Sequence, residues 1–168
     1  MPVALSRCIK KESENVAEAQ SATESFSGTT PSFQTEVLVR FADCDPAGIV
    51  FYPRFLEMFN NLVEDWCAAG LNFSFSDIVI KNGWGLPTVH LEADFVSPCR
   101  LGEVLTAKLF VRSLGTSSIK ADIALCGPDQ SERVRGKVVL VLMDRRSYRA
   151  LPFPEALRKR ISSFVLSE

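Results

Sequence analysis

The chain has 168 residues and a formal net charge of −1, with 46% apolar and 23% charged residues. These values are typical of one soluble globular domain with a substantial core. A charge so close to zero argues against nucleic acid or an anionic membrane as a partner. No window approaches the ~20 consecutive apolar residues of a membrane span, and the N-terminus lacks the apolar region of a signal peptide.

The cysteines are scattered along the chain. There are five of them, an odd number without a CxxC pair, and the single histidine is His90. This pattern favours reduced thiols over a disulfide framework or a zinc site. We therefore expect a cytoplasmic protein without a bound metal.

The first part of the chain differs in composition from the rest. Residues 1–32 are rich in Ser, Glu, Thr and Ala, which predicts a mobile N-terminal tail. The folded domain is expected over residues 33–168. It begins with a β-rich run from Thr35 to Phe41, which predicts the first strand.

A long helix is the next predicted element. Pro53 opens it, because proline suits the first helical turn, and the helix runs to about Ala69 with Gly70 as its C-terminal stop. Its apolar residues cover about half of the circumference, wider than the ~100° stripe of a surface helix. This arc indicates a helix that a sheet curls around. The apolar residues are Phe55, Leu56, Met58, Phe59, Leu62, Val63, Trp66 and Cys67.

Period-two patterning replaces the helical pattern after this helix. Gly83 and Gly85 beside Trp84 predict a break in regular structure. Short connections favour the pairing of consecutive strands. The predicted fold is α+β, a curved antiparallel sheet wrapped around a long central helix. The predicted strands are Leu86–Val96, Glu103–Leu114, Ser117–Leu125 and Glu132–Met143, with a short helix over Ser74–Ile80 and a C-terminal helix over Pro154–Phe164.

An acidic loop connects the first strand to the long helix. It contains Asp43, Cys44 and Asp45, and Gly48 offers an unusual backbone dihedral or a close approach. A carboxylate beside the electropositive start of a helix suits attack on a polarised carbonyl. Aspartate also forms turns before helices. We assign that role to Asp43, and the residues alone favour the same role for Asp45. The two acids are expected to raise the pKa of Cys44.

The sequence from Phe41 to Phe55 closely resembles the 4-hydroxybenzoyl-CoA thioesterase family of hot-dog-fold acyl-CoA thioesterases. Its Asp-Cys-Asp-Pro-Ala-Gly-Ile-Val core resembles the signature of the branch that uses a loop aspartate. The order and spacing of the later strands are similar too, over about residues 34–146. The resemblance implies a hot-dog fold and hydrolysis of an aromatic or short- to medium-chain acyl-CoA to the free acid and coenzyme A.

The resemblance also implies roles for residues of the motif. Asp45 is implied as the catalytic carboxylate, which attacks the thioester carbonyl or activates a water molecule. The backbone N–H of Tyr52 at the helix start is implied as the group that binds the carbonyl oxygen. Gly48, Val50 and Phe51 are implied as substrate contacts.

Further substrate contacts are expected outside the motif. His90 is a candidate at the helix start, with a hydrogen-bonded structural histidine as the alternative. Ser117 and Ser118 offer hydroxyl and N–H groups to pantetheine or phosphate, with an ordinary β-turn as the alternative. Coenzyme A arrives as part of the substrate, so no cofactor is expected.

Other functions remain open at this stage. A hot-dog hydratase or dehydratase would combine an acid with a histidine, and the separation of His90 from Asp45 distinguishes that reading. A non-catalytic acyl-CoA-binding module would use the same pocket without turnover. By resemblance we expect a homo-oligomer, a dimer with active sites shared across its interface that assembles into a tetramer.

Overall fold

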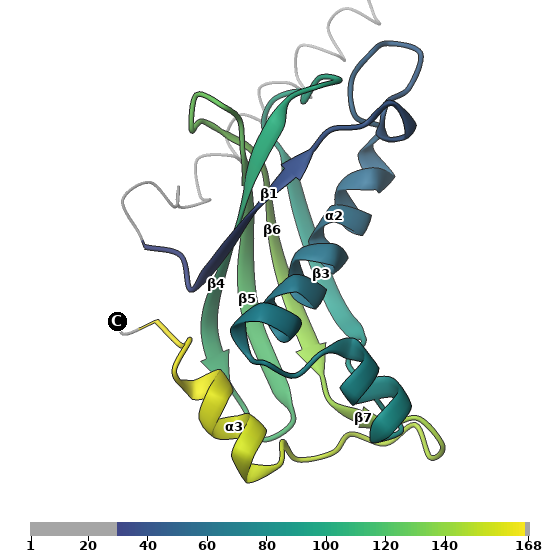
Figure 1. Ribbon diagram of the computed structural model, residues 1–168, viewed down its shortest axis with the longest axis vertical. Coiled ribbons are helices and arrows are strands. Elements are labelled where there is room, and N and C mark those ends of the chain that lie inside the picture. The colour runs from purple at the N-terminus through teal and green to yellow at the C-terminus, as the bar shows by residue number, and fades with distance from the viewer. Residues whose placement is uncertain (1–29, 167–168) are drawn as a thin grey trace, which may run out of the picture.

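The protein is described from a computed structural model, over residues 30–166. Five strands form one antiparallel sheet in the order β1-β4-β5-β6-β3, and the long helix α2 lies along one face of it (Figure 1). The predicted α+β architecture, an antiparallel sheet around a long helix, is confirmed. The elements are β1 (Phe33–Leu38), α2 (Tyr52–Asp65), β3 (Thr88–Phe95), β4 (Val104–Leu114), β5 (Ser118–Cys126) and β6 (Glu132–Val141).

The helix α2 buries the predicted face against the sheet, except for Leu56, which is exposed. A π-helical segment, η2 (Trp66–Gly70), continues it. Gly70 does end this segment, but the left-handed residue after it is Asn72, with φ 48°. Gly70 is needed for another reason, because a Cβ there would lie 2.7 Å from Cδ1 of the Trp66 ring.

The core fills the space between α2 and the sheet. Phe59 and Trp66 of the helical segment are 2% and 0% exposed, and the facing strand residues Leu109, Ile123 and Val138 are buried as well. The closest approach is at Gly136 in β6, where a Cβ would lie 2.5 Å from Cε2 of Phe59. The absence of a side chain at Gly136 therefore lets the helix lie close to the sheet.

The pairing of the strands differs from the sequence prediction in one respect. β3 pairs with β6 and β4 pairs with β1, so the consecutive strands β3 and β4 are not neighbours. The turn between them, residues 96–103, carries the chain from one edge of the sheet to the other. Val96 N–H donates to Arg133 O of β6, and Val39 N–H donates to Glu103 O at 2.9 Å. The short-connection rule fails here because this turn crosses the sheet end.

Two shorter segments also depart from the prediction. The first strand ends at Leu38, and a 3₁₀ turn, η1 (Phe41–Asp43), follows it where strand was expected. The predicted break around Trp84 is a two-residue strand, β2 (Trp84–Gly85), which pairs with β7 (Met143–Asp144). The pairing of β2 with β7 joins segments far apart in the chain, which local patterning does not report.

Further helical segments cover the end of the molecule opposite the start of α2 (Figure 1). The connector after α2 contains η3 (Asp77–Lys81), within the region where a short helix was predicted. The C-terminal helix α3 (Glu155–Ser162) is bound to the rest of the chain through Arg158, which donates to Gly115 O at 2.7 Å, and Arg160, which donates to Leu71 O at 3.0 Å. None of the helices in residues 30–166 combines the length and apolar composition needed to cross a membrane.

The predicted N-terminal tail lies almost wholly outside the described residues. Only its last three residues, 30–32, are part of the description, and β1 begins at Phe33. The division into a tail and a domain at this point stays a prediction.

Candidate active site

The acidic loop is a closed turn at the N-terminal end of α2, at the top of Figure 1. Asp45 N–H donates to Ile49 O at 3.0 Å, and Gly48 N–H donates to Asp45 O at 2.9 Å. Gly48 has φ +75°, and a Cβ on it would meet no atom within 4 Å. Of the two reasons predicted for this glycine, the unusual dihedral is therefore confirmed, and no other part of the described chain approaches it closely.

The two carboxylates of the loop have different surroundings. Asp43 Oδ2 accepts the N–H of Arg40 at 2.7 Å, and Asp43 O accepts the N–H of Phe51 at 2.9 Å, which confirms its loop-ordering role. Asp45 Oδ1 accepts the N–H of Ala47 at 2.8 Å. Within residues 30–166, Asp45 Oδ2 has no hydrogen-bond partner. The turn thus fixes the Asp45 carboxylate through one oxygen and leaves the other oxygen available.

The start of α2 leaves one backbone donor free among the described residues. Phe51 is the N-cap residue, and its own N–H is used by Asp43 O. Pro53 has no N–H, and Arg54 N–H donates to Phe51 O at 2.8 Å. Tyr52 N–H has no acceptor in residues 30–166. A helix start directs such unpaired N–H groups and a partial positive charge toward an anionic ligand.

The surroundings of the Cys44 thiol make it unreactive. Partial burial, followed by the charges of Asp43 and Asp45, raises the pKa of the Cys44 thiol, as predicted. Because the thiolate is the reactive form, Cys44 is a poor nucleophile. The carboxylate of Asp45 is the stronger candidate in this loop.

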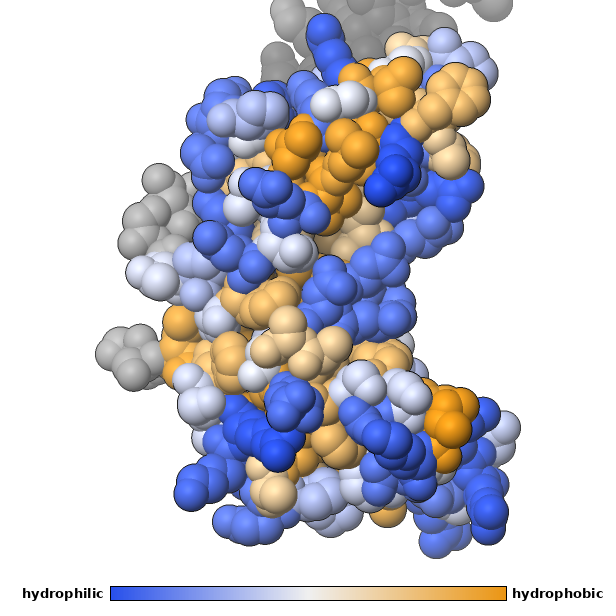
Figure 2. Space-filling view, in the orientation of Figure 1, coloured by the Kyte–Doolittle hydropathy of each residue, from blue (hydrophilic) through white to orange (hydrophobic). Residues whose placement is uncertain are grey.

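Aromatic rings surround the helix start. The Tyr52 ring lies 5.3 Å from Phe51 and 6.2 Å from Phe95, measured between ring centroids, and Phe55 lies 5.8 Å from Phe95. Phe51, Tyr52 and Phe95 are about half exposed, whereas Val50 is buried with its N–H bonded to Cys99 O. Of the predicted site residues, Asp45, Gly48, Phe51 and Tyr52 therefore meet at one surface. Figure 2 shows apolar side chains gathered at this end of the molecule.

His90 lies elsewhere in the same chain. It pairs with Val139, between the buried residues Val138 and Leu140, so its side chain is on the sheet face opposite α2. Its Nε2 is 3.0 Å from Glu92 Oε1. Five residues separate it from Phe95, about 17 Å along the strand. One chain therefore does not bring His90 and Asp45 together, as a hydratase-type site would require.

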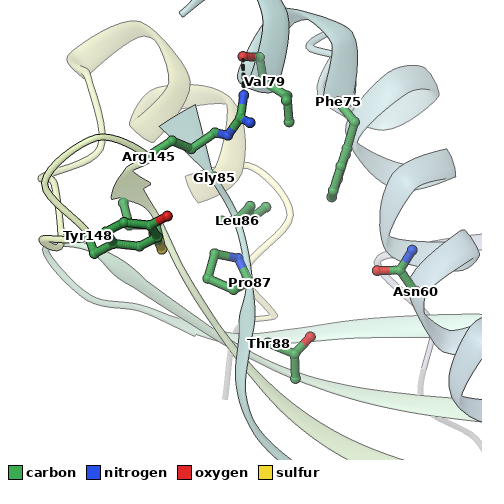
Figure 3. Close-up of a pocket in the computed structure, with 10 residues that line it drawn as sticks. Asn60, Phe75, Val79, Gly85, Leu86, Pro87, Thr88, Arg145 and Tyr148 are labelled. Carbon is green, nitrogen blue, oxygen red and sulfur yellow. Dashed lines mark hydrogen bonds between the residues drawn. The ribbon is translucent and has the colours of Figure 1, made fainter. Parts of the chain in front are cut away.

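A pocket of about 410 Å³ opens at the other end of β3 (Figure 3). It lies between α2, η3, the chain leading into β3, and the turn after β7. Arg145 lines it while donating to Val79 O at 3.3 Å. Ser118 pairs with Val141, whose N–H donates to Pro87 O, so Ser117 and Ser118 lie at this same end. The lining residues are Asn60, Phe75, Val79, Gly85, Leu86, Pro87, Thr88, Met143, Arg145 and Tyr148.

Sequence reasoning did not find this pocket. Asn60 comes eight residues after Tyr52, about 12 Å along the helix, and the other walls come from three later segments. Tyr148 has φ 56°, a left-handed conformation that is unusual for a tyrosine and has no sequence signal of its own. The sequence offered one clue, Pro87 before Thr88. Proline is confined to the starts and edges of strands, so it indicates that a strand begins here.

A family model described as the thioesterase-like superfamily matches residues 39–161. The chain belongs to this superfamily. Among the relatives of this thioesterase-like chain, the 1,4-dihydroxy-2-naphthoyl-CoA hydrolase of Synechococcus elongatus is 30% identical over 129 residues, which cover 75% of the chain and 92% of the relative. The prediction of a thioester hydrolase with a hot-dog fold is confirmed at this level. The narrower 4-hydroxybenzoyl-CoA thioesterase family stays a prediction.

Solved structures show the same fold as this thioesterase. The 1,4-dihydroxy-2-naphthoyl-CoA thioesterase of Synechocystis has a TM-score of 0.71 at 24% identity, with 77% of this chain and 95% of that chain covered. A Staphylococcus aureus protein solved in complex with CoA has a TM-score of 0.73 at 17% identity, with 79% and 82% covered.

Proposed function

We propose that this thioesterase hydrolyses an aromatic acyl-CoA, with Asp45 as nucleophile or general base and Tyr52 N–H as the oxyanion donor. The observation that carries the proposal is a hydrogen-bonded loop that leads directly into a helix start. Within residues 30–166, the loop leaves Asp45 Oδ2 without a partner and the helix start leaves Tyr52 N–H without one. Thioester hydrolysis needs a group of each kind.

The chemistry follows from these two groups. The Tyr52 N–H would bind the thioester carbonyl oxygen, on which negative charge develops as the carbonyl carbon is attacked. Asp45 Oδ2 would either attack that carbon or take a proton from an attacking water molecule. The thiolate of coenzyme A is a good leaving group, so neither a metal nor a redox cofactor is required by this step.

The pocket supports an aromatic acyl group. Its volume of about 410 Å³ is in the range of pockets that bind small organic molecules, about 300–1,000 Å³. Phe75, Leu86 and Met143 supply apolar walls, while Asn60 and Arg145 supply polar groups. The Synechococcus relative carries the name of a naphthoyl-CoA hydrolase, and a fused aromatic acyl group is the substrate class that we propose here. CoA bound to the Staphylococcus aureus protein supports coenzyme A as the carrier.

A homodimer would bring the two parts of the site together. Within one chain, the acidic loop and the pocket lie at opposite ends of β3. This strand is at one edge of the sheet and, among the described residues, pairs with β6 alone. Antiparallel pairing of β3 with the same strand of a second copy places the loop end of one protomer at the pocket end of the other. Ser117 and Ser118 would then approach coenzyme A from the pocket side. Assembly of such dimers into a tetramer is part of the proposal.

The proposed location is the cytoplasm. Cys44, Cys67, Cys99 and Cys126 are all free thiols, which is the state that a reducing compartment maintains.

The test of the carboxylate is thiol release from a panel of aromatic, short-chain and long-chain acyl-CoAs. Asp45→Asn keeps the size of the side chain and removes its charge. We expect the variant to lose about 10²–10⁴-fold in kcat, the usual contribution of a positioned acid or base, while it still binds the substrate. Equal rates for the two proteins, or no turnover of any substrate, would refute the proposal.

The test of the oxyanion donor deletes one N–H. Tyr52→Pro removes it at the first helical position, where proline is tolerated, and Phe51 already has the extended conformation that a following proline requires (φ −67°, ψ 123°). Tyr52→Ala removes the same ring and keeps the N–H. We expect the proline variant to be slower than the alanine variant by about 10²–10³-fold in kcat. Equal kcat values would remove Tyr52 N–H from the mechanism.

A further inference from the structure

The outer edge of β3, which has no partner strand within residues 30–166, has a distinct pattern of side chains. Leu91, Ala93 and Phe95 point toward α2, and His90, Glu92 and Asp94 point away from it. Leu91 and Phe95 are 37% and 47% exposed although they lie on the core side. An edge strand with exposed apolar residues is a template for pairing with another strand. The two acids and the histidine on the opposite face limit how that pairing can be made.

Symmetry restricts the register. Two identical edge strands can form one continuous antiparallel sheet when a two-fold axis relates them and runs perpendicular to the sheet. Under this symmetry, a side chain on one face of the first copy stays on the same face in the second copy. Residues directly opposite each other in an antiparallel pair have their side chains on the same face. The residue numbers of two opposed positions therefore differ by an even number. The pairing is therefore centred on one residue that faces its own copy. Leu91, Glu92 and Ala93 are the central positions of the regular part of the strand, because a bulge interrupts it between Thr88 and His90.

The three registers differ in which charged side chains they place opposite each other. Centring on Glu92 places His90 against the second copy's Asp94, twice, but also places the Glu92 carboxylate against its own copy. Centring on Ala93 places Glu92 against the second copy's Asp94, twice. Centring on Leu91 places His90 against the second copy's Glu92, twice, and opposes no two acids. Like charges directly opposite each other destabilise a sheet, and opposite charges stabilise it.

We infer that two copies of this chain pair along β3 in the register centred on Leu91, with His90 of each protomer facing Glu92 of the partner subunit. The inference rests on the proposed dimer and adds its register and its selective contact. Leu91 packs against its own copy on the core side. Phe95, which contacts Tyr52, comes close to the start of β3 in the partner subunit, at the mouth of the pocket. His90 thereby acts as an interface residue.

Disulfide trapping reads the register directly. Opposed Cα atoms of an antiparallel pair are about 4.5–5.5 Å apart, within the limit of about 7 Å for a disulfide. A shift by two residues separates them by about 8–9 Å. We therefore expect Leu91→Cys to form a covalent dimer under mild oxidation and Glu92→Cys not to form one. Wild type serves as the control for the native cysteines, and mass spectrometry identifies the linked peptide.

Charge reversal tests the contact itself. Glu92→Lys and Asp94→Lys are matched, because each acid lies opposite a cation of its own chain, Lys137 and Arg135 respectively. We expect Glu92→Lys to raise the dimer Kd about tenfold, because the two cross-strand contacts between His90 and the Glu92 carboxylate are lost. Asp94→Lys, which faces no charged residue of the partner in this register, should change it less than about threefold. Analytical ultracentrifugation measures both constants, and the double variant His90→Glu/Glu92→Lys should restore the affinity.

The outcomes separate the register from the dimer. A covalent dimer of Glu92→Cys but not of Leu91→Cys, with weakening by Asp94→Lys alone, would overturn the register and leave the dimer standing. A wild-type monomer in light scattering at assay concentration, with no crosslink in either variant, would overturn the dimer as well. Neither result would change what the kinetic tests of Asp45→Asn and Tyr52→Pro show about the proposed chemistry.

Discussion

Gly136→Ala is expected to destabilise the fold through the contact between α2 and the sheet. The new Cβ would lie 2.5 Å from Phe59 Cε2, 3.0 Å from Cζ and 3.2 Å from Cδ2. Carbon atoms in good contact are about 3.5–4.0 Å apart, so the ring or the helix must move by about 1 Å. Phe59 is 2% exposed and has little free space around it.

The expected magnitude combines two opposing effects. Overpacking of a core costs about 1–3 kcal/mol, and replacement of glycine by alanine gains about 0.4–1 kcal/mol by restricting the unfolded chain. The net loss is about 1–2 kcal/mol in the free energy of unfolding. With a urea m-value of about 2 kcal/mol/M, the unfolding midpoint should fall by about 0.5–1 M.

Two further variants make this test specific. Gly85→Ala is the matched control, because a Cβ there meets its nearest atom, Met143 Cγ, at an ordinary 3.4 Å. Phe59→Leu in the Gly136→Ala background should recover part of the loss, because the leucine lacks the ring edge that clashes. An unchanged midpoint for Gly136→Ala, or a double variant with strictly additive losses, would refute the close-approach argument.

Two other predictions concern the pocket-side end. Hydrogen bonds from Lys81 and then Ser74 lower the pKa of Asp77 from 3.8 to about 2, so its stabilising contribution is complete above pH 4 and is lost as the pH falls toward 2. Urea unfolding of Asp77→Asn should therefore show a deficit at pH 7 that shrinks between pH 4 and pH 2; a deficit independent of pH would contradict this. Tyr148→Gly should raise the free energy of unfolding by up to about 1 kcal/mol, because glycine adopts the left-handed conformation without the steric cost of a side chain. A lower urea midpoint for this variant would show that the tyrosine ring contributes more than its backbone conformation costs.

The parts of the molecule that sequence predicted correctly are local in the chain. The acidic loop, the helix start and the buried helix face all depend on neighbours within a few residues, such as the bond from Gly48 N–H to Asp45 O. Periodicity reports that information directly. Leu56 was wrongly assigned to the buried face because a wide apolar arc does not specify where the sheet ends.

The parts that sequence missed depend on contacts between distant segments. The pairing of β3 with β6, and of Trp84–Gly85 with Met143–Asp144, is decided by the path of the chain across the sheet end. The pocket has walls from four separate segments, and no one of them carries a recognisable motif. His90 was expected near the start of α2. Strand alternation indicates on which face of the sheet its side chain lies, but not how far along the strand it is from the start of α2.

The separation of loop and pocket along β3 has a consequence for mixed populations of chains. Under the proposed arrangement, each catalytic centre takes its carboxylate from one chain and its pocket from the other. Asp45→Asn and a variant with a filled pocket, such as Thr88→Trp, would each be inactive alone. After subunits exchange in an equal mixture, half of the dimers are hybrids, and each hybrid has one centre with both parts intact. Complementation should therefore return about a quarter of the wild-type activity, a yield that two self-sufficient chains cannot give.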